Sequence, residues 1–354
     1  MPLRTPLSGP GVWLGKDIAN SPRWVKTLPA GGAAELAAAV AAVNRRGLDW
    51  KDIRRADFPL PTLAPFLADV TDELENGCGI VKITGMTVAN HDEDDLRRLY
   101  FGIGTHVGTP VFQNRTGELM RAIRDEGAHV GRTYGQIEGK GTSGGTFLSS
   151  YARTLTNGGL RYHTDRTDVV GLLCVRQAMA GGISKLGSTP AIHNAILERR
   201  PDLLDELFKP FWRSRLGEES TDPATVYALP IFGLRDGKFT SHYSLTFIEA
   251  AEMVPGVPKL TSAQRQAIDM LMSVAEEVSF SMTLEPGDLQ LINSHVTYHG
   301  RTPFEDDFNA GKSRMLLRLW LSMANSRPLP DDHAVLWRDV RAGAVRGGIA
   351  QDAR

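Results

Sequence analysis

The segment "EPGDLQLINSHVTYHGR", residues 285–301, combines a turn, a strand and two histidines. Pro-Gly-Asp at 286–288 favours a tight turn, and "LQLIN" at 289–293 is typical of a buried strand. Side chains two residues apart in an extended chain point to the same side. The residues that would share one face here are His295, Thr297, His299 and Arg301. The segment therefore predicts a β-rich core with two histidines on one face.

A second segment, "RYHTDRTD" at 161–168, places His163 and Asp165 two residues apart. On an extended stretch, an imidazole and a carboxylate at this spacing can reach one metal ion. Two histidines and one carboxylate that leave other coordination positions open form the facial triad of non-heme Fe(II) oxygenases. Strand spacing alone does not decide whether His295 or His299 is the second histidine.

A third segment, "KSRMLLRLWLS" at 312–322, reads as a strand with two different faces. Arg314, Leu316, Arg318 and Trp320 alternate with Met315, Leu317, Leu319 and Leu321. If the apolar face packs under helices, both arginines point into the core. A buried arginine needs an anionic partner, which a carboxylate supplies in a bidentate pair. The alternative is a strand with one solvated face and two surface arginines.

The order of the expected elements indicates an α+β fold with a mostly antiparallel β core. Helices are expected at 32–46, 64–76, 93–102, 188–200, 201–208 and 261–277, and strands at 79–85, 109–114, 119–125 and 169–175. We predict an N-terminal helical extension over 1–78, a β domain over 79–330 with a helical insertion at about 188–280, and a C-terminal tail over 331–354. "GKGTSG" at 139–144 lacks the strand and helix of a dinucleotide site and is predicted to be a mobile loop. The segment 125–150 around it is the candidate for a lid over an active site that must exclude water.

The composition excludes several classes of protein. The chain has 354 residues, 42% of them hydrophobic and 23% charged, with a net charge of -1. No global field favours nucleic acid, and no apolar run has the length of a membrane span, so we expect neither partner. Two cysteines, Cys78 and Cys174, do not make a disulfide framework, which favours a cytoplasmic location. A homo-oligomer is compatible with the sequence.

Four motifs together resemble the TauD/TfdA dioxygenases, a family that includes γ-butyrobetaine hydroxylase. They are "YHTD" at 162–165, "AGGIS" at 180–184, "EPGDLQLINSHVTYHGR" at 285–301 and "SRMLLR" at 313–318. The resemblance covers roughly residues 79–322. It implies a double-stranded β-helix, a jelly-roll variant, with flanking helices and an iron site at its mouth. Thr109 stands where the taurine enzyme has a substrate-binding histidine before Pro-Val, so a sulfonate substrate is not implied.

The resemblance also implies a role for individual residues. His163, Asp165 and His299 would bind Fe(II), with His299 preferred because Gly-Arg follows it. Arg314 and Ser184 would bind the far carboxylate of the co-substrate 2-oxoglutarate. The candidate substrate contacts are Arg318, Tyr162 and Asn114.

The expected reaction is hydroxylation of an unactivated C–H bond of a small anionic molecule, with consumption of O₂ and release of succinate and CO₂. Two alternatives remain at this point: a catalytically silent, cupin-like metal-binding protein, and a metal-dependent hydrolase. Arg314 with Ser184 discriminates, since a hydrolase needs no buried arginine for a co-substrate carboxylate.

Overall fold

The larger of the two main sheets, which is mostly antiparallel, forms the centre of the molecule. The computed structural model describes residues 3–89 and 91–351. Seven described strands make this sheet, in the order β1 (Val25–Thr27), β2 (Ile80–Thr84), β16 (Leu289–Asn293), β8 (Val169–Arg176), β19 (Met315–Ser322) and β3 (Thr109–Pro110), with β4 (Met120–Ile123) also paired to β19. Only β1 and β2 run parallel among these described pairs.

The smaller sheet carries two of the candidate ligands. Its order is β15 (Phe280–Met282), β10 (Ser184–Ser188), β17 (Thr297–Arg301) and β7 (Leu160–His163). All three pairings are antiparallel, and His299 on β17 lies opposite His163 on β7. One cavity is lined by residues of both sheets, so the two sheets face each other across it.

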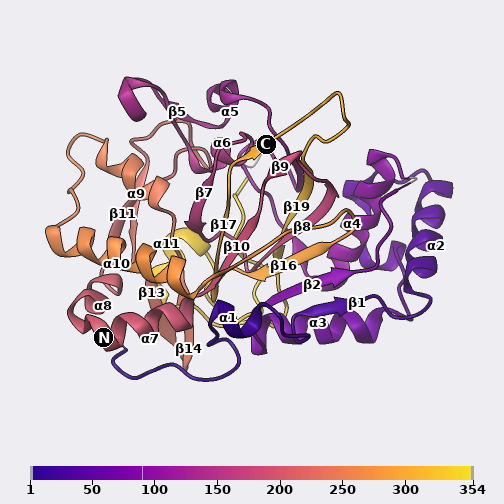
Figure 1. Cartoon of the computed structure of the whole chain (residues 1–354), viewed down its shortest axis with the longest axis horizontal. Helices are drawn as coiled ribbons and strands as arrows, with labels where there is room; N and C mark the ends of the chain where they lie inside the picture. Colours follow the sequence, from indigo (N-terminus) through magenta and orange to yellow (C-terminus); the bar gives the residue numbers. More distant parts are fainter. Residues whose placement is uncertain (1–2, 90, 352–354) are drawn as a thin grey trace.

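Helices cover the outer face of each sheet (Figure 1). On the larger sheet lie α2 (Gly32–Arg45), α3 (Ala64–Asn76) and α4 (Glu93–Val107), whose apolar residues share a core with Leu317, Leu319 and Leu321 of β19. On the smaller sheet lie α7 (Thr189–Arg199), α8 (Pro201–Leu207) and α10 (Ser262–Val278), packed with Tyr162 and Tyr298. The predicted α+β fold with flanking helices is confirmed.

The segment between β10 and β15 contains strands as well as helices. Two hairpins, β11 (Phe211–Ser214) with β12 (Val226–Leu229) and β13 (Phe232–Arg235) with β14 (Lys238–Ser241), precede α9 (Leu245–Glu252). The expectation of a helical insertion was therefore incomplete. The extension before residue 79 is also mixed, because β1 joins the larger sheet there.

The predicted strand at 109–114 is shorter than expected. Only Thr109–Pro110 pairs with β19. Asn114 accepts hydrogen bonds from the Thr116 backbone N–H (3.1 Å) and hydroxyl (2.7 Å), and this turn ends the extended run. The C-terminal segment includes α11 (Ala334–Trp337), and Gly348 and Ile349 near its end donate backbone hydrogen bonds to the carbonyls of Arg166 and Phe112. Among the described residues, no helix has the length and apolarity needed to cross a bilayer.

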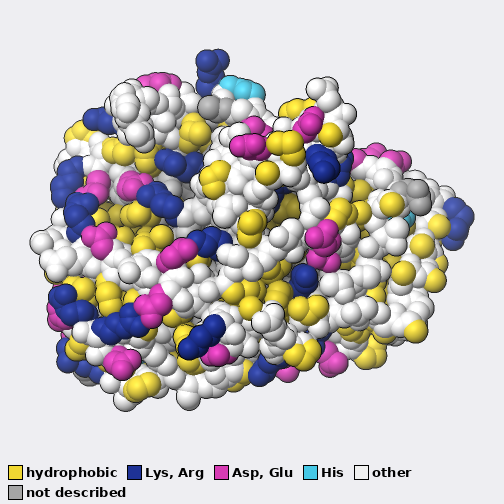
Figure 2. Space-filling view, viewed as in Figure 1, with side chains coloured by type: hydrophobic (Ala, Val, Ile, Leu, Met, Phe, Trp, Pro, Cys, Tyr) yellow, Lys and Arg dark blue, Asp and Glu magenta, His cyan; other side chains and the backbone are white. Residues whose placement is uncertain are grey.

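Charges of both signs are interspersed on the face shown in Figure 2. This face carries no broad region of a single sign. The surface agrees with the near-neutral composition, and it offers no extended basic track for a nucleic acid backbone on that side.

Candidate metal centre and active site

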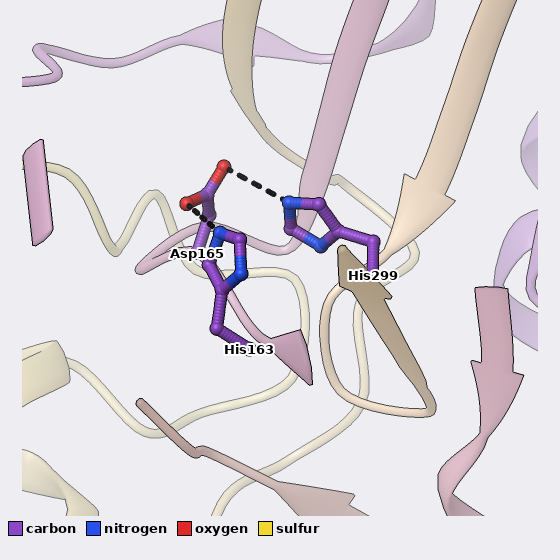
Figure 3. A group of neighbouring side chains, drawn as sticks. All are labelled: His163, Asp165 and His299. Carbon is purple, nitrogen blue, oxygen red and sulfur yellow. Dashed lines mark ion pairs between the residues drawn. The ribbon is translucent and has the colours of Figure 1, made fainter. Parts of the chain in front are cut away.

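Three side chains converge where the smaller sheet meets β8 (Figure 3). His163 ends β7, Asp165 follows in the link to β8, and His299 lies on β17. His163 Nε2 is 3.8 Å from Asp165 Oδ1, and His299 Nε2 is 3.9 Å from Asp165 Oδ2. The ring centroids of the two histidines are 4.2 Å apart. Two imidazoles and one carboxylate thus present one ligand atom each to a common point.

The environment keeps both imidazoles neutral, which is the form that binds a metal. Burial lowers the pKa of His163, and burial together with His163 lowers the pKa of His299 to about 3. His163 Nδ1 lies 2.8 Å from the carbonyl oxygen of Arg161. Because a carbonyl only accepts, Nδ1 carries the proton and Nε2 keeps its lone pair toward Asp165.

Asp165 is ionised despite its burial. Burial alone would raise its pKa, but the cationic Arg318 and the hydrogen bond from Trp320 counter that effect, and the pKa is lowered. Arg318 Nη1 lies 3.8 Å from Asp165 Oδ2, and Trp320 donates its indole N–H to the same oxygen at 3.0 Å. An anionic oxygen ligand is therefore present beside two neutral nitrogen ligands.

His295, the other candidate histidine, lies in a different network. Its Nε2 is 2.9 Å from Asp168 Oδ1, and its Nδ1 is 2.8 Å from the Thr240 hydroxyl. Both ring nitrogens are thus engaged away from His163 and Asp165. The alternation of side chains holds only within β17. His295 lies in the turn at 294–296, so it does not share a face with His299.

The cavity beside the triad contains buried guanidinium groups. Arg314 and Arg318 are only 6% and 4% exposed, so the alternative of two surface arginines is excluded. Both line the cavity, together with Leu316 and Ser184, while Met315 and Leu317 face the helix-covered core. Arg314 Nη1 is buried without a hydrogen-bond partner among the described residues, and burial lowers the Arg314 pKa to about 10. An unpaired buried cation of this kind favours an anionic ligand.

Arg318 is fixed by residues that the sequence did not single out. Gln113 Nε2 donates to the carbonyls of Arg318 (2.8 Å) and Leu119 (3.0 Å), so its Oε1 accepts from Arg318 Nε at 2.7 Å. The guanidinium lies 5.3 Å from the Tyr151 ring and 5.2 Å from the Trp320 ring. Arg318 Nη2 is buried and unpartnered among the described residues. Gln113 directly precedes Asn114, and nothing in a single sequence distinguishes the two amides.

The two remaining sequence candidates are not among the cavity-lining residues. Asn114 Nδ2 donates to the Tyr151 hydroxyl at 2.8 Å inside a buried polar network. Tyr162 alternates with His163 on β7, so its ring belongs to the core beneath the outer helices, with its hydroxyl 2.5 Å from the Ser279 hydroxyl. Their role as substrate contacts stays a prediction.

The cavity is narrow and has apolar walls. Leu160, Val170 and Leu172 line it, and Ile123 and Thr154 contribute from the segment that flanks 125–150. The volume open to the centre of a water molecule is about 40 Å³. One bound water needs roughly 10–15 Å³ of such volume. The triad, the arginines and these apolar side chains therefore bound one common space.

Comparison with known proteins places the chain among dioxygenases. The model of the taurine catabolism dioxygenase TauD, TfdA family matches residues 44–320. FR-33289 synthase of Streptomyces rubellomurinus is 30% identical over 337 residues, which cover 93% of this chain and 94% of that protein. Taurine hydroxylase-like protein SAT17 of Stachybotrys chartarum is 26% identical over 315 residues, covering 87% and 77%.

Solved structures share the fold. Asparagine oxygenase in complex with Fe(II), a hydroxyasparagine and succinate aligns with a TM-score of 0.64 and 16% identity, over 91% of this chain and 100% of that one. The non-heme iron oxygenase OrfP with Fe and alpha-ketoglutaric acid aligns with a TM-score of 0.59 and 16% identity, over 84% and 94%. These likenesses confirm the predicted jelly-roll core.

Proposed function

The chain belongs to the TauD/TfdA family of dioxygenases, and on that premise we propose that His163, Asp165 and His299 hold its Fe(II) while Arg318 binds an anionic group of its substrate. The protein is a non-heme iron, 2-oxoglutarate-dependent oxygenase that hydroxylates a small molecule, with O₂ as the second co-substrate. The residue roles and the charge of the substrate are our inference.

The donor set fits Fe(II). Two neutral imidazole nitrogens and one carboxylate oxygen lie within 4.8 Å of one another, and each residue offers one ligand atom. This is the ligand set of non-heme iron oxygenases, which leaves coordination positions open. When bound, the iron supplies activation of O₂ for attack on a C–H bond. The chain supplies three oriented ligands, with the Arg161 carbonyl fixing the His163 tautomer.

Arg314 and Ser184 would bind the far carboxylate of 2-oxoglutarate. Both line the cavity with the triad, and Arg314 Nη1 has no partner among the described residues. The guanidinium is held over the Phe304 ring at 5.2 Å, and Gly182 leaves room for it, because a Cβ there would lie 2.9 Å from Arg314 Nε. A preoriented guanidinium binds a carboxylate with less loss of entropy.

The proposal of an anionic substrate rests on the surroundings of Arg318. Its Nη2 is buried and unpartnered among the described residues, and the Nη1–Asp165 distance of 3.8 Å leaves that pair short of a hydrogen bond. Arg318 lies on β19 with its Nη1 3.8 Å from Asp165 Oδ2, whereas Arg314 directly precedes that strand and forms no ion pair with Asp165 among the described residues, so the two cations occupy different depths. Leu160 and Leu172 add apolar walls to the same cavity.

The two alternative functions, a hydrolase and a silent metal-binding protein, leave the buried arginines of the cavity unexplained. A metal-dependent hydrolase or a silent metal-binding protein would use the triad, but neither needs a buried arginine with an unpaired N–H beside it. Reaction with a co-substrate and an anionic substrate accounts for both arginines.

The test begins under anaerobic conditions with Fe(II) and 2-oxoglutarate. We expect a visible metal-to-ligand charge-transfer band that His163→Ala abolishes. Succinate release is then screened across carboxylates, sulfonates, phosphonates, amino acids and quaternary amines. Stimulation by anionic compounds alone supports the role of Arg318; stimulation by cationic or neutral compounds alone would contradict it.

We further infer a cytoplasmic location and a small-molecule substrate as the only required partner. Cys78 and Cys174 are buried free thiols, which suits a reducing compartment. Size-exclusion chromatography with light scattering decides whether the chain forms a homo-oligomer.

A further inference from the structure

The carboxylate of Asp165 has two chemically different oxygens. Oδ2 accepts the indole N–H of Trp320 at 3.0 Å, and it lies 3.8 Å from Arg318 Nη1 and 3.9 Å from His299 Nε2. Within residues 3–89 and 91–351, no hydrogen bond is donated to Oδ1, which is 3.8 Å from His163 Nε2. One oxygen is therefore already engaged by the protein, and the other remains available.

Trp320 is held rigidly by the core. It is 2% exposed, and its ring packs among Val170, Leu186 and Ile292 between the two sheets. The indole N–H is the one polar group of the Trp320 side chain, and Asp165 accepts its hydrogen bond. A fixed donor of this kind determines the rotation of the carboxylate, in the way that outer hydrogen bonds orient metal ligands elsewhere.

We propose that Trp320 is a positioning residue that keeps Asp165 a one-oxygen ligand. This inference rests on the proposed iron site. An octahedral ion with three single-atom protein ligands has three open positions, which suffice for a chelating 2-oxoacid and O₂. A carboxylate that turned both oxygens to the ion would occupy one of them. The Trp320 N–H, by binding Oδ2, preserves the position that the second co-substrate requires.

Trp320→Phe isolates this hydrogen bond, because it removes the N–H and keeps a ring beneath Arg318. Trp24→Phe is the matched control. Trp24 is also buried in the same core cluster, and its indole donates to the Ile18 carbonyl at 2.9 Å. The two variants should lower the melting temperature of the metal-free protein by similar amounts. Only the effect on the metal centre should differ.

Two binding measurements on purified, anaerobic protein provide the test. For Trp320→Phe we expect Fe(II) affinity, measured by chelator competition, to fall about tenfold or more. The charge-transfer band with 2-oxoglutarate should then require more 2-oxoglutarate even at saturating Fe(II). Trp24→Phe should match the unmodified protein in both. Equal Fe(II) and 2-oxoglutarate affinities in the two variants would overturn the proposal.

Two further variants keep the outcome interpretable. If Trp320→Phe does not fold, benzothienylalanine at position 320 replaces the N–H by sulfur in a ring of nearly the same shape, with the same expected losses. Asp165→Ala separates this proposal from the one it rests on. Retained Fe(II) in Asp165→Ala defeats the iron site itself, whereas loss there with normal binding in the Trp320 variants defeats only the role of Trp320.

Discussion

At the scale of single residues, the clearest distinction is between the two histidines of 295–299. His299→Ala removes a ligand of the proposed iron site, so the purified protein should contain little iron. His295→Ala should keep its iron but lose stability, because Asp168 is left buried with one partner fewer. Iron stoichiometry and melting temperature of both variants are the measurements. Iron lost from His295→Ala and kept in His299→Ala would refute the assignment.

His163→Ala and Asp165→Ala should each lose iron and turnover while the fold survives. His163 ends β7, Asp165 lies in the link to β8, and neither belongs to a large apolar cluster, so far-ultraviolet circular dichroism should be unchanged. Any 2-oxoglutarate-dependent activity retained by Asp165→Ala would count against the triad.

The two cavity arginines should separate in their effects. Arg314→Ala should weaken 2-oxoglutarate binding by about ten- to a hundredfold, since a charge-assisted pair contributes ~1.5–3 kcal/mol. Arg318→Ala should leave succinate formation without substrate partly intact and impair productive oxidation. Titration of the charge-transfer band measures the first effect, and the ratio of hydroxylated product to succinate measures the second. Loss of 2-oxoglutarate binding in Arg318→Ala alone would reverse the assignment.

Glu218 provides a pH-dependent prediction. Burial raises its pKa from 4.5 to about 7, an effect only partly offset by Arg166. Because the folded-state pKa is the higher one, the stability from the neutral carboxyl is present below pH 4.5 and is lost as pH rises through 7. Glu218→Gln should therefore gain stability relative to the unmodified protein between pH 5 and 8, by up to roughly 3 kcal/mol.

Urea unfolding of the metal-free protein at several pH values measures this difference. The neighbouring Glu219→Gln is the control, because its effect on stability at neutral pH should have the opposite sign. Burial would raise the Glu219 pKa, but Arg166 and Arg215 lower it, so its replacement should cost stability at neutral pH and cost less in acid. A constant difference for Glu218→Gln across this range would contradict the prediction.

At the scale of elements, β19 shows what a sequence pattern can predict. Alternation placed Arg314, Leu316, Arg318 and Trp320 on one face. The first three line the cavity, and Trp320 packs in a core cluster. The contacts of Trp320 with Asp165 and of Gln113 with Arg318 could not be predicted, because they join segments far apart in the chain. One missed element had a readable signal: Asp236-Gly237, both at positive φ, forms the turn of the β13–β14 hairpin.

The segment 125–150 is the element that we expect to move. It contains only short pieces, including α5 (Gly131–Tyr134), β5 (Gln136–Ile137) and β6 (Phe147–Leu148), and "GKGTSG" lies in the turn between β5 and β6. Hydrogen exchange there should be fast in the metal-free protein and slow when Fe(II), 2-oxoglutarate and substrate are bound. Slow exchange that ligands do not change would exclude a lid.

At the scale of the whole molecule, the C-terminal segment joins both sides of the active site. Gly348 and Ile349 donate backbone N–H groups to the carbonyls of Arg166 (2.7 Å) and Phe112 (2.8 Å). Arg346 is 1% exposed and donates to Asp168 Oδ1 at 2.9 Å and to the Arg327 carbonyl at 2.7 Å. The segment thus connects the link that holds Asp165 to the loop that holds Gln113.

Arg346→Met should destabilise the protein by about 3–5 kcal/mol, the usual effect of removing one partner of a buried ion pair. Arg341→Met provides the control, because its partner Asp339 lies with it at the surface, and no measurable change is expected. Denaturant unfolding of both variants is the measurement. A loss in Arg346→Met no larger than in Arg341→Met would show that the segment contributes little.

The insertion between β10 and β15 begins and ends on strands that pair with each other, with Ser184 opposite Met282. A segment with adjacent ends can be exchanged between relatives without displacing the strands around it. One part of it is not free to vary: the Thr164 backbone N–H donates to the Tyr243 carbonyl at 2.8 Å, between the two ligands His163 and Asp165. Chimeras that replace the helical layer should therefore keep the metal centre only when residues 240–244 are retained, which sets the boundary for domain grafting in this enzyme.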